Sequence, residues 1–358
     1  MNPCRELIVT LLTIHLYLMN KLNTVLAFFL MLILVQTGRS QSISNPDRKL
    51  LIKKEDSLKV YADSMINAES AGKRFLSDSQ FVKTFVRALK IKNSFYYTFD
   101  SLETVSRRYP QDSSFRIFTW QLKKDEYMYY QKGAIQMKTP DGSLKLYPLF
   151  DASMFTSKPN DSVRTRNNWI GAIYYRIIQK EFNGRKYYTM LGFDDYTVSS
   201  NRKWMEVMHF SDETGEPIFG GPMISFKDDT SKLKPILYRF NIEYKKEART
   251  NFNYNSEKDM IIYDHLISEN DQPERKETYI PDGDFEGFKW ENGQWVHVEQ
   301  VFNFKLKDGE FPQEATIKDA EGNIDEKKLM EQSEKNIERA KKKEDEKKTP
   351  HIKKKSGN

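Results

Sequence analysis

The sequence predicts an α+β protein in which N-terminal helices pack on a large antiparallel β-sheet, built as a meander, a sandwich or a partial barrel. As far as residue 110, apolar residues recur every three or four positions, which is the period of a helix face. From Phe115 onward they recur at every second position, which is the period of a half-buried strand. Turn dipeptides separate the strand-like runs, and such short connections join antiparallel neighbours.

Residues 41–110 are the expected helical segment. A second helix is expected to begin at Ser77, because Gln80 follows three residues later as in a capping box. A third, short helix is expected to begin at Asp100 and must end before Pro110, since proline cannot continue a helix. The apolar residues that share one face of the first helix are Leu51, Leu58, Tyr61 and Met65.

Residues 111–324 are the expected antiparallel β domain. Two of the connections are Asn-Gly pairs, at 183–184 and 292–293, and each predicts a two-residue type I′ hairpin. The strand-like runs are 115–122, 127–137, 144–150, 169–180, 186–193, 204–210, 236–244, 260–267, 285–291 and 295–306.

The second Asn-Gly turn fixes which residues face each other across its hairpin. The six residues from 290 to 295 resemble designed tryptophan-zipper hairpins, and this resemblance implies a hairpin and nothing more. We expect the opposite face of the hairpin, with Val296 and Val298, to be the core side. The expected cross-strand pairs are Trp290–Trp295, Phe288–His297 and Glu286–Glu299.

The Glu286–Glu299 pair is the most interesting of these, because two like charges directly opposite each other destabilise a sheet. Beside His297, the pair could bind a divalent metal or hold one carboxyl protonated as an acid. The alternative is a solvated face on which both glutamates point into water.

The first forty residues read as an N-terminal export signal. An unbroken apolar run extends from Val25 to Val35. It is shorter than the roughly 20 residues that span a bilayer, but it suits the apolar core of a signal peptide. Lys21 precedes the run and small residues stand just before Gln41, so the mature chain is expected to begin there.

A signal peptide of ordinary length would begin at Met19, and residues 1–18 are then an over-extended reading frame. The alternative is an uncleaved membrane anchor. The single cysteine, Cys4, lies in the segment that is expected to be removed, so the mature chain would have no disulfide and no thiolate ligand. The expected location is the periplasm or the exterior of the cell.

The formal net charge of +6 comes from the two ends of the chain. Residues 1–40 carry +2 and residues 325–358 carry +4, so the body between them is neutral. A neutral body lacks the basic surface that nucleic acids require, and we expect no nucleic-acid partner. The tail at 325–358 has too few apolar residues to fold alone and is expected to be a solvated helix or disordered. It could make peripheral contact with a membrane or an anionic envelope surface.

No strong catalytic motif is present. The chain has no zinc-protease helix, no nucleophile elbow and no phosphate-binding glycine loop, and we expect no cofactor or metal. The candidates for catalysis are carboxylates in or directly after strands, namely Asp194, Asp195, Glu286 and Glu299. The candidates for binding are Trp204, Trp290, Trp295 and His297.

Three stretches together are similar to a group of secreted proteins of uncharacterised function from Gram-negative bacteria. They are GFDDYTVSSNRKWMEVMHF at 192–210, MIIYDHL at 260–266 and YIPDGDFEGFKWENGQWV at 279–296. The resemblance covers most of residues 90–310. It implies an envelope setting and supplies no activity, fold or catalytic residue.

The sequence therefore favours an exported, non-catalytic module that binds an envelope partner, a glycan or an apolar ligand. Such a protein would have an exposed aromatic patch or a groove without clustered carboxylates. One alternative is a hydrolase of envelope material that uses carboxylates or a metal, in which the candidate carboxylates and a histidine converge. Another alternative is a half-barrel lipid carrier with a continuous apolar lumen.

The export signal leads to a first prediction. N-terminal sequencing of the protein recovered from outside the cytoplasm should read from Gln41, because the signal peptidase cuts after the small residues that precede it. Recovery of a chain that still contains Leu30 would contradict cleavage and favour the anchor.

Overall fold

The computed structural model describes residues 15–24, 42–226 and 236–302. Residues 15–24 form a helix. Within the described ranges, no helix has both the length and the apolar character needed to cross a bilayer. The expected signal-peptide core, its cleavage site and the charged tail lie outside these ranges.

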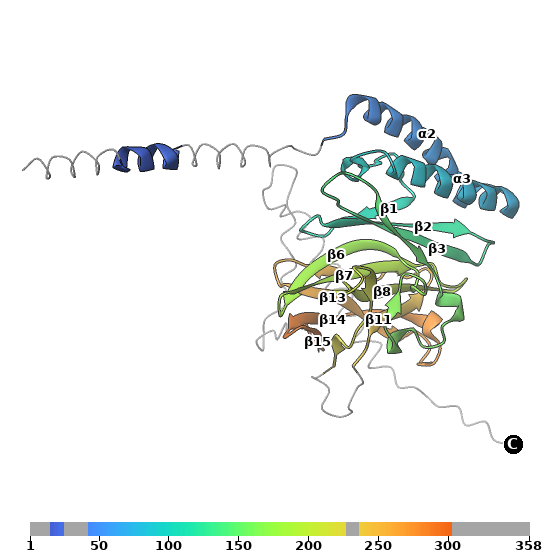
Figure 1. The fold of residues 1–358 in the computed structure, drawn as a ribbon. Coiled ribbons are helices and arrows are strands. Elements are labelled where there is room, and N and C mark those ends of the chain that lie inside the picture. Colours follow the sequence, from blue (N-terminus) through green and yellow to red (C-terminus); the bar gives the residue numbers. More distant parts are fainter. Residues whose placement is uncertain (1–14, 25–41, 227–235, 303–358) are drawn as a thin grey trace, which may run out of the picture. The chain divides into compact units, whose positions relative to one another are not determined.

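The body from residue 42 to 302 has four stacked layers, one of helices and three of strands (Figure 1). Helices α2 and α3 cover a first sheet, the first sheet packs on a second, and the second packs on a third. The expected α+β class, with N-terminal helices on antiparallel sheets, is confirmed. The strands are divided among three sheets, so the layers form a multiple sandwich.

The helical layer consists of two helices, α2 at Asn45–Asn67 and α3 at Ala71–Leu89. The two helices pack against each other. Each begins at a serine cap, Ser44 for α2 and Ser70 for α3. The expected face of the first helix is confirmed, since Leu51, Leu58 and Met65 are buried and Tyr61 packs against the same core.

Two expectations for this layer are wrong. Ser77 does not cap a helix; it lies inside α3 and its hydroxyl donates to Ser64 of α2 at 2.7 Å. The third helix is absent from the described residues, and Val105–Arg108 instead form strand β1. The backbone N–H and C=O groups of β1 form hydrogen bonds with the strand at residues 115–123. A single capped helical turn would leave most of these groups without partners.

The first sheet has the order β1-β2-β3-β4 and is antiparallel throughout. Its strands after β1 are β2 (Phe115–Lys123), β3 (Tyr129–Met137) and β4 (Lys145–Phe150). The described residues of the body include four short 3₁₀ helices, at Ser94–Tyr96, Ser153–Phe155, Pro159–Asp161 and Lys276–Thr278, labelled η1 to η4.

The second sheet is built around β7 and β8. One edge of β8 pairs with β7, and its other edge pairs with β9 and β11. The expected Asn183-Gly184 turn joins β6 to β7, and both turn residues have the positive φ that a type I′ turn requires. The strands are β5 (Arg164–Thr165), β6 (Ile173–Phe182), β7 (Arg185–Asp194), β8 (Ser200–Phe210), β9 (Pro217–Phe219) and β11 (Arg239–Lys245).

The third sheet has the order β10-β15-β14-β13-β12 and is antiparallel except between β10 and β15. Its last hairpin has the expected register, since Trp290 pairs with Trp295 and Phe288 with His297. The strands are β10 (Ile224–Ser225), β12 (Phe252–Asn255), β13 (Met260–Ser268), β14 (Tyr279–Glu291) and β15 (Gln294–Val298).

The core side of this hairpin is opposite to the expected one. Phe288, Trp295 and His297 are buried against the second sheet, whereas Val296 and Val298 are only half-buried. An isolated hairpin pattern gives apolar residues on both faces, so it cannot say which face the next layer covers.

A buried ion pair lies inside the second sheet. The Arg239 guanidinium of β11 contacts the Glu206 carboxylate of β8, and their side chains are 0% and 2% exposed. The Tyr174 hydroxyl donates to Glu206 at 2.6 Å, and the carbonyl of Phe219 accepts from Arg239 at 2.9 Å. Both charges are thus hydrogen-bonded, which is the condition under which burying an ion pair is tolerated.

Removing one partner of this pair should destabilise the protein severely. Arg239→Met would leave Glu206 buried without its counter-charge and should lower the free energy of unfolding by about 3–5 kcal/mol. Urea denaturation followed by circular dichroism measures this. The matched control is Lys245→Met, which breaks a solvent-exposed pair with Glu269 and should leave the free energy of unfolding nearly unchanged. Equal losses in the two variants would contradict the prediction.

Candidate functional site

A carboxylate pair lies where β7 ends, next to the first sheet. Asp194 is the last residue of β7 and is the register partner of Arg202 on β8. Gln131 of β3 reaches it from the first sheet, and its Nε2 donates to Asp194 Oδ1 at 3.0 Å. The second carboxylate, Asp151, follows β4 directly and lies near enough to Asp194 to act on it electrostatically.

Close backbone packing holds this group together. The Asp151 Oδ1 atom accepts the N–H groups of Ser153 and Gly171, at 2.9 and 3.0 Å. A Cβ atom placed on Gly171 would lie 2.3 Å from Gln131 Cβ and 2.7 Å from Asp151 Cγ. Only glycine therefore allows the two side chains to approach the backbone at this point.

The electrostatic environment raises the pKa of Asp194 from 3.8 to about 6. Burial is the largest cause, because it penalises the ionised carboxyl, and the negative charge of Asp151 acts in the same direction. The positive charge of Arg202 and the hydrogen bonds from Gln131 and Trp204 oppose the shift without cancelling it. Strongly perturbed carboxyls of this kind are concentrated at functional sites.

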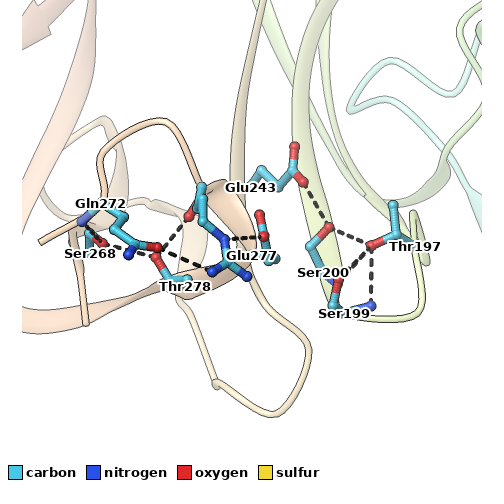
Figure 2. Close-up of polar contacts among 9 residues, drawn as sticks. Thr197, Ser199, Ser200, Glu243, Ser268, Gln272, Glu277 and Thr278 are labelled. Carbon is cyan, nitrogen blue, oxygen red and sulfur yellow. Dashed lines mark hydrogen bonds and ion pairs between the residues drawn. The ribbon is translucent and has the colours of Figure 1, made fainter. Parts of the chain in front are cut away.

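Beside the site, at the start of β8, hydroxyl groups form a network with Glu243 (Figure 2). Ser200 at the start of β8 contacts Thr197 at 2.8 Å and donates to Glu243 of β11 at 2.7 Å. The other Glu243 oxygen accepts from Arg202 at 2.9 Å, and the Arg202 guanidinium carbon lies 3.3 Å over the ring centre of Tyr196. The contacts therefore set the position of the arginine beside Asp194.

One buried acceptor of the site lacks a donor. Gln131 is 3% exposed, and its Oε1 atom meets no hydrogen-bonding partner among the described residues. Its Nε2 atom already donates to Asp194, and the neighbouring Asp195 is paired with Lys246. A buried acceptor without a donor is costly, so this group is suited to a ligand that supplies donors.

A second polar cluster lies on the third sheet. The Glu286 carboxylate of β14 contacts His297 Nε2 at 2.8 Å and lies 3.6 Å from His265 Nε2. It also accepts a hydrogen bond from the Tyr263 hydroxyl of β13. Burial raises the pKa of Glu286, but the hydrogen bonds from His297 and Tyr263 outweigh it, and the net pKa is lowered. The carboxylate is therefore held ionised by its protein partners.

A bulge brings His265 to this cluster. The register between β13 and β14 shifts between Asp264 and Leu266, and Gly283 opposite has a φ of 100° that favours glycine. The His265 Nδ1 atom lies 2.7 Å from Asp282 Oδ2. The Asp282-Gly283 pair thus lies at a bulge within β14.

The expected Glu286–Glu299 pair does not form. Val298 still pairs with Gly287, but the amide of Val301 donates to Phe285 at 3.1 Å, one position out of that register. Glu299 is exposed in the irregular stretch, and Glu286 faces Tyr263 instead. Among the described residues, no group of three or more His, Cys, Asp or Glu side chains could hold a metal ion.

Of the other sequence candidates, Trp204 lies beside Asp194, and its side chain acts to lower the pKa of that carboxyl. Trp204 and Trp295 are buried in two different cores, so neither offers a ring to a ligand at the surface. Trp290 is half-buried and packs against Trp295 with ring centres 5.3 Å apart. Asp194 and Asp195 end one strand of the second sheet, whereas Glu286 is in the third sheet, and their hydrogen-bonding partners are different residues. The four carboxylates therefore do not make one cluster.

Sequence reasoning missed the residues that complete both clusters. Asp151 and Gln131 carried no motif, and only the packing of the first sheet on the second brings them to Asp194. His265 and Asp282 were not chosen, because a regular strand gives no reason for them to meet Glu286. The glycine at 283 was the one available signal, since an isolated glycine in a strand often marks a bulge.

No protein-family model matches this chain, and neither a curated protein nor a solved structure matches it. The similarity to secreted proteins of Gram-negative bacteria accordingly stays a prediction.

The raised pKa of Asp194 predicts a pH-dependent stability. In the unfolded chain the carboxyl ionises near 3.8 and in the folded chain near 6, so this group makes the fold less stable as pH rises through that window. Asp194→Asn removes the ionisable group. The free energy of unfolding of the variant minus that of the wild type should therefore be about 1–3 kcal/mol larger at pH 8 than at pH 4. Chemical denaturation of both proteins at the two pH values measures the difference.

The control for that measurement is Asp212→Asn, which removes an exposed carboxylate paired with Arg185 and should give no such gain at pH 8. A wild-type protein whose stability rises from pH 4 to 6, with no relative gain in Asp194→Asn, would contradict the assignment.

Proposed function

We propose that this protein is an exported, non-catalytic module that binds a glycan at the Asp151–Asp194 site. The single observation that carries the proposal is the buried Gln131 Oε1 atom beside Asp194, which lacks a donor among the described residues. A sugar presents several hydroxyl donors at fixed spacing, which suits such a group.

The charges around the site favour a neutral ligand over a cation. The charge of Arg202 acts on Asp194, and Lys246 pairs with the adjacent Asp195. These positive charges offset part of the negative potential that a metal ion would need. A neutral polyol can donate to the carboxylates and accept from the guanidinium, so it satisfies groups of both kinds.

The rim of the site supports a sugar ligand as well. Tyr196 is exposed at 41% and is held by the stacked Arg202. An exposed, fixed aromatic ring provides the flat apolar surface on which the C–H face of a sugar can pack. Export to the periplasm or cell exterior, expected from the first forty residues, would bring the site to envelope polysaccharides.

The separation of the carboxylates favours binding over catalysis. Glu286 is engaged by His297 and Tyr263, Asp195 by Lys246, and Glu299 is exposed, so none of them joins Asp194. A lipid carrier would need an apolar lumen, whereas the spaces between the layers are filled by the side chains of three cores.

One observation favours a second candidate, a glycoside hydrolase. The pKa of Asp194 is raised to about 6 next to a second carboxylate, Asp151, and such a pair is the machinery of acid-assisted glycosidic cleavage. In that case Asp194 would protonate the leaving oxygen and Asp151 would act as the base or nucleophile. Release of reducing ends from a bound polysaccharide would identify this activity.

The binding proposal is tested with purified protein on immobilised bacterial polysaccharides and insoluble peptidoglycan. Wild-type protein should be retained on one of these glycans, and Asp151→Asn with Asp194→Asn should weaken retention by about tenfold or more, since two charged hydrogen bonds to the ligand are lost. Asparagine keeps the shape of the side chain, so the fold should survive, which circular dichroism checks.

The matched control is Asp212→Asn, a carboxylate of the same charge outside the site, which should be retained like the wild type. Calcium is tested in parallel. If calcium raises the melting temperature of the wild type and Asp194→Asn abolishes this rise, the site binds a cation and the glycan proposal is wrong. Failure of every glycan to retain the wild-type protein would refute the proposal.

A further inference from the structure

Helix α3 carries a row of cationic side chains on the side that faces away from the core. The residues at 76, 80, 83, 87 and 90 are spaced by four, three, four and three positions, so they share one face of the helix. All five are exposed, whereas the opposite face of α3 is buried against the first sheet. The cations of this row, Lys83, Arg87 and Lys90, are called the cationic ridge below.

The cations of the ridge have no carboxylate partners. Among the described residues, none of the three side chains forms an ion pair. The one acidic residue of α3, Asp78, is already paired with Lys132 of β3 at 3.3 Å, and its side chain is only 13% exposed. The ridge therefore presents its positive charge to the solvent.

The rest of the helical segment is positive as well. Residues 42–92 hold eleven Lys or Arg and six Asp or Glu, a net charge of +5. Residues 93–302 hold 28 Lys or Arg and 31 Asp or Glu, a net charge of −3. The positive charge of the body is thus concentrated in the helical layer. Because like charges repel each other, an anion that contacts several of these cations would be attracted strongly.

The helix dipole accounts for only part of this arrangement. The C-terminal end of a helix favours cations, but the effect falls off beyond the last turn. Arg87 lies in the last turn of α3, whereas Lys83 lies before it. The row of cations therefore extends further along the helix than the dipole explains.

The shape of the ridge favours an extended polyanion over a small ion. The outer surface of a helix is convex, and Lys83 and Lys90 are separated by about 10 Å along the helix axis. A single small anion cannot contact both of them. A polymer with an anionic group on successive units can follow the ridge and pair with each cation in turn.

A bilayer is a poorer match to this face. A helix that inserts into a membrane surface needs apolar side chains along the inserted face. Leu76 is the only apolar residue of the exposed row, since Phe75 and Val82 are offset from the row by one residue, or about 100° around the helix. Phe75 contacts Tyr130 of β3, with ring centres 6.1 Å apart, so that side of α3 turns toward the first sheet. The ridge therefore suits a polymer in water.

We propose that the cationic ridge of α3 binds an anionic polysaccharide. The anionic groups of the polymer pair with Lys83, Arg87 and Lys90, and the contact is made at the surface of the helix. This contact involves different residues from the Asp151–Asp194 site, so it does not depend on the function proposed there.

The experiment measures binding of the purified protein to alginate, which carries carboxylates, to dextran sulfate, which carries sulfates, and to neutral dextran. Wild-type protein should bind the two anionic polymers but not dextran, and the affinity should fall as salt rises because exposed ion pairs are screened. The variant Lys83→Gln with Arg87→Gln and Lys90→Gln should bind about tenfold more weakly, since three exposed ion pairs are lost.

The matched control removes the same number of charges from exposed positions outside α3, by Lys138→Gln with Lys145→Gln and Lys158→Gln. This variant should bind like the wild type. All of these proteins keep the lysine-rich tail, so any contribution of the tail is common to them. Glutamine is a good helix former, so α3 should persist in the ridge variant, which circular dichroism checks.

Three results would each overturn the proposal: no binding of the wild type to either anionic polymer, equal binding to dextran, or equal losses in the two triple variants. Flotation with phosphatidylglycerol vesicles that the ridge variant abolishes, without binding to the polymers, would replace the polysaccharide with a bilayer. Asp194→Asn should bind alginate like the wild type, so this proposal and the one for the Asp151–Asp194 site can fail separately.

Discussion

The burial of both faces of β7 and β8 is the constraint on which the rest of the structure depends. Met190 and Trp204 face the first sheet, while Leu191 and Met205 face the third. A strand that is apolar on both sides must be covered on both sides, so the second sheet becomes the central layer of strands. The ion pair between Glu206 and Arg239 also lies in this layer, and it requires complete hydrogen bonding because water cannot reach it.

Both polar clusters occur where this layered packing is interrupted. The Asp194 site forms where β7 ends and its last carboxyl meets residues that emerge from the first sheet. The Glu286 cluster forms where a bulge breaks the ladder between β13 and β14 and turns His265 toward its neighbours. The two differ in a way that matters for function. Glu286 is surrounded by donors from the protein, whereas the Gln131 Oε1 atom beside Asp194 has no donor among the described residues.

Asp151 has two structural roles. Its charge helps to raise the pKa of Asp194, and its Oδ1 atom accepts the amides of Ser153 and Gly171. The same side chain therefore shapes the carboxylate site and anchors the turn that follows β4.

The sequence by itself determined the class of the fold, the face of the first helix, most strands and the partners nearest both Asn-Gly turns, because these depend on periodicity and on local turn geometry. It did not determine which face of the last hairpin is buried, or that Val105 joins a sheet, because both depend on which layer lies next to the element. It identified Asp194 but not Asp151 and Gln131, and Glu286 but not His265. Only the tertiary structure brings these residues into contact, because they are distant in sequence. Close packing at Gly171 brings Gln131 and Asp151 together, and the bulge in the β13–β14 ladder brings His265 to Glu286.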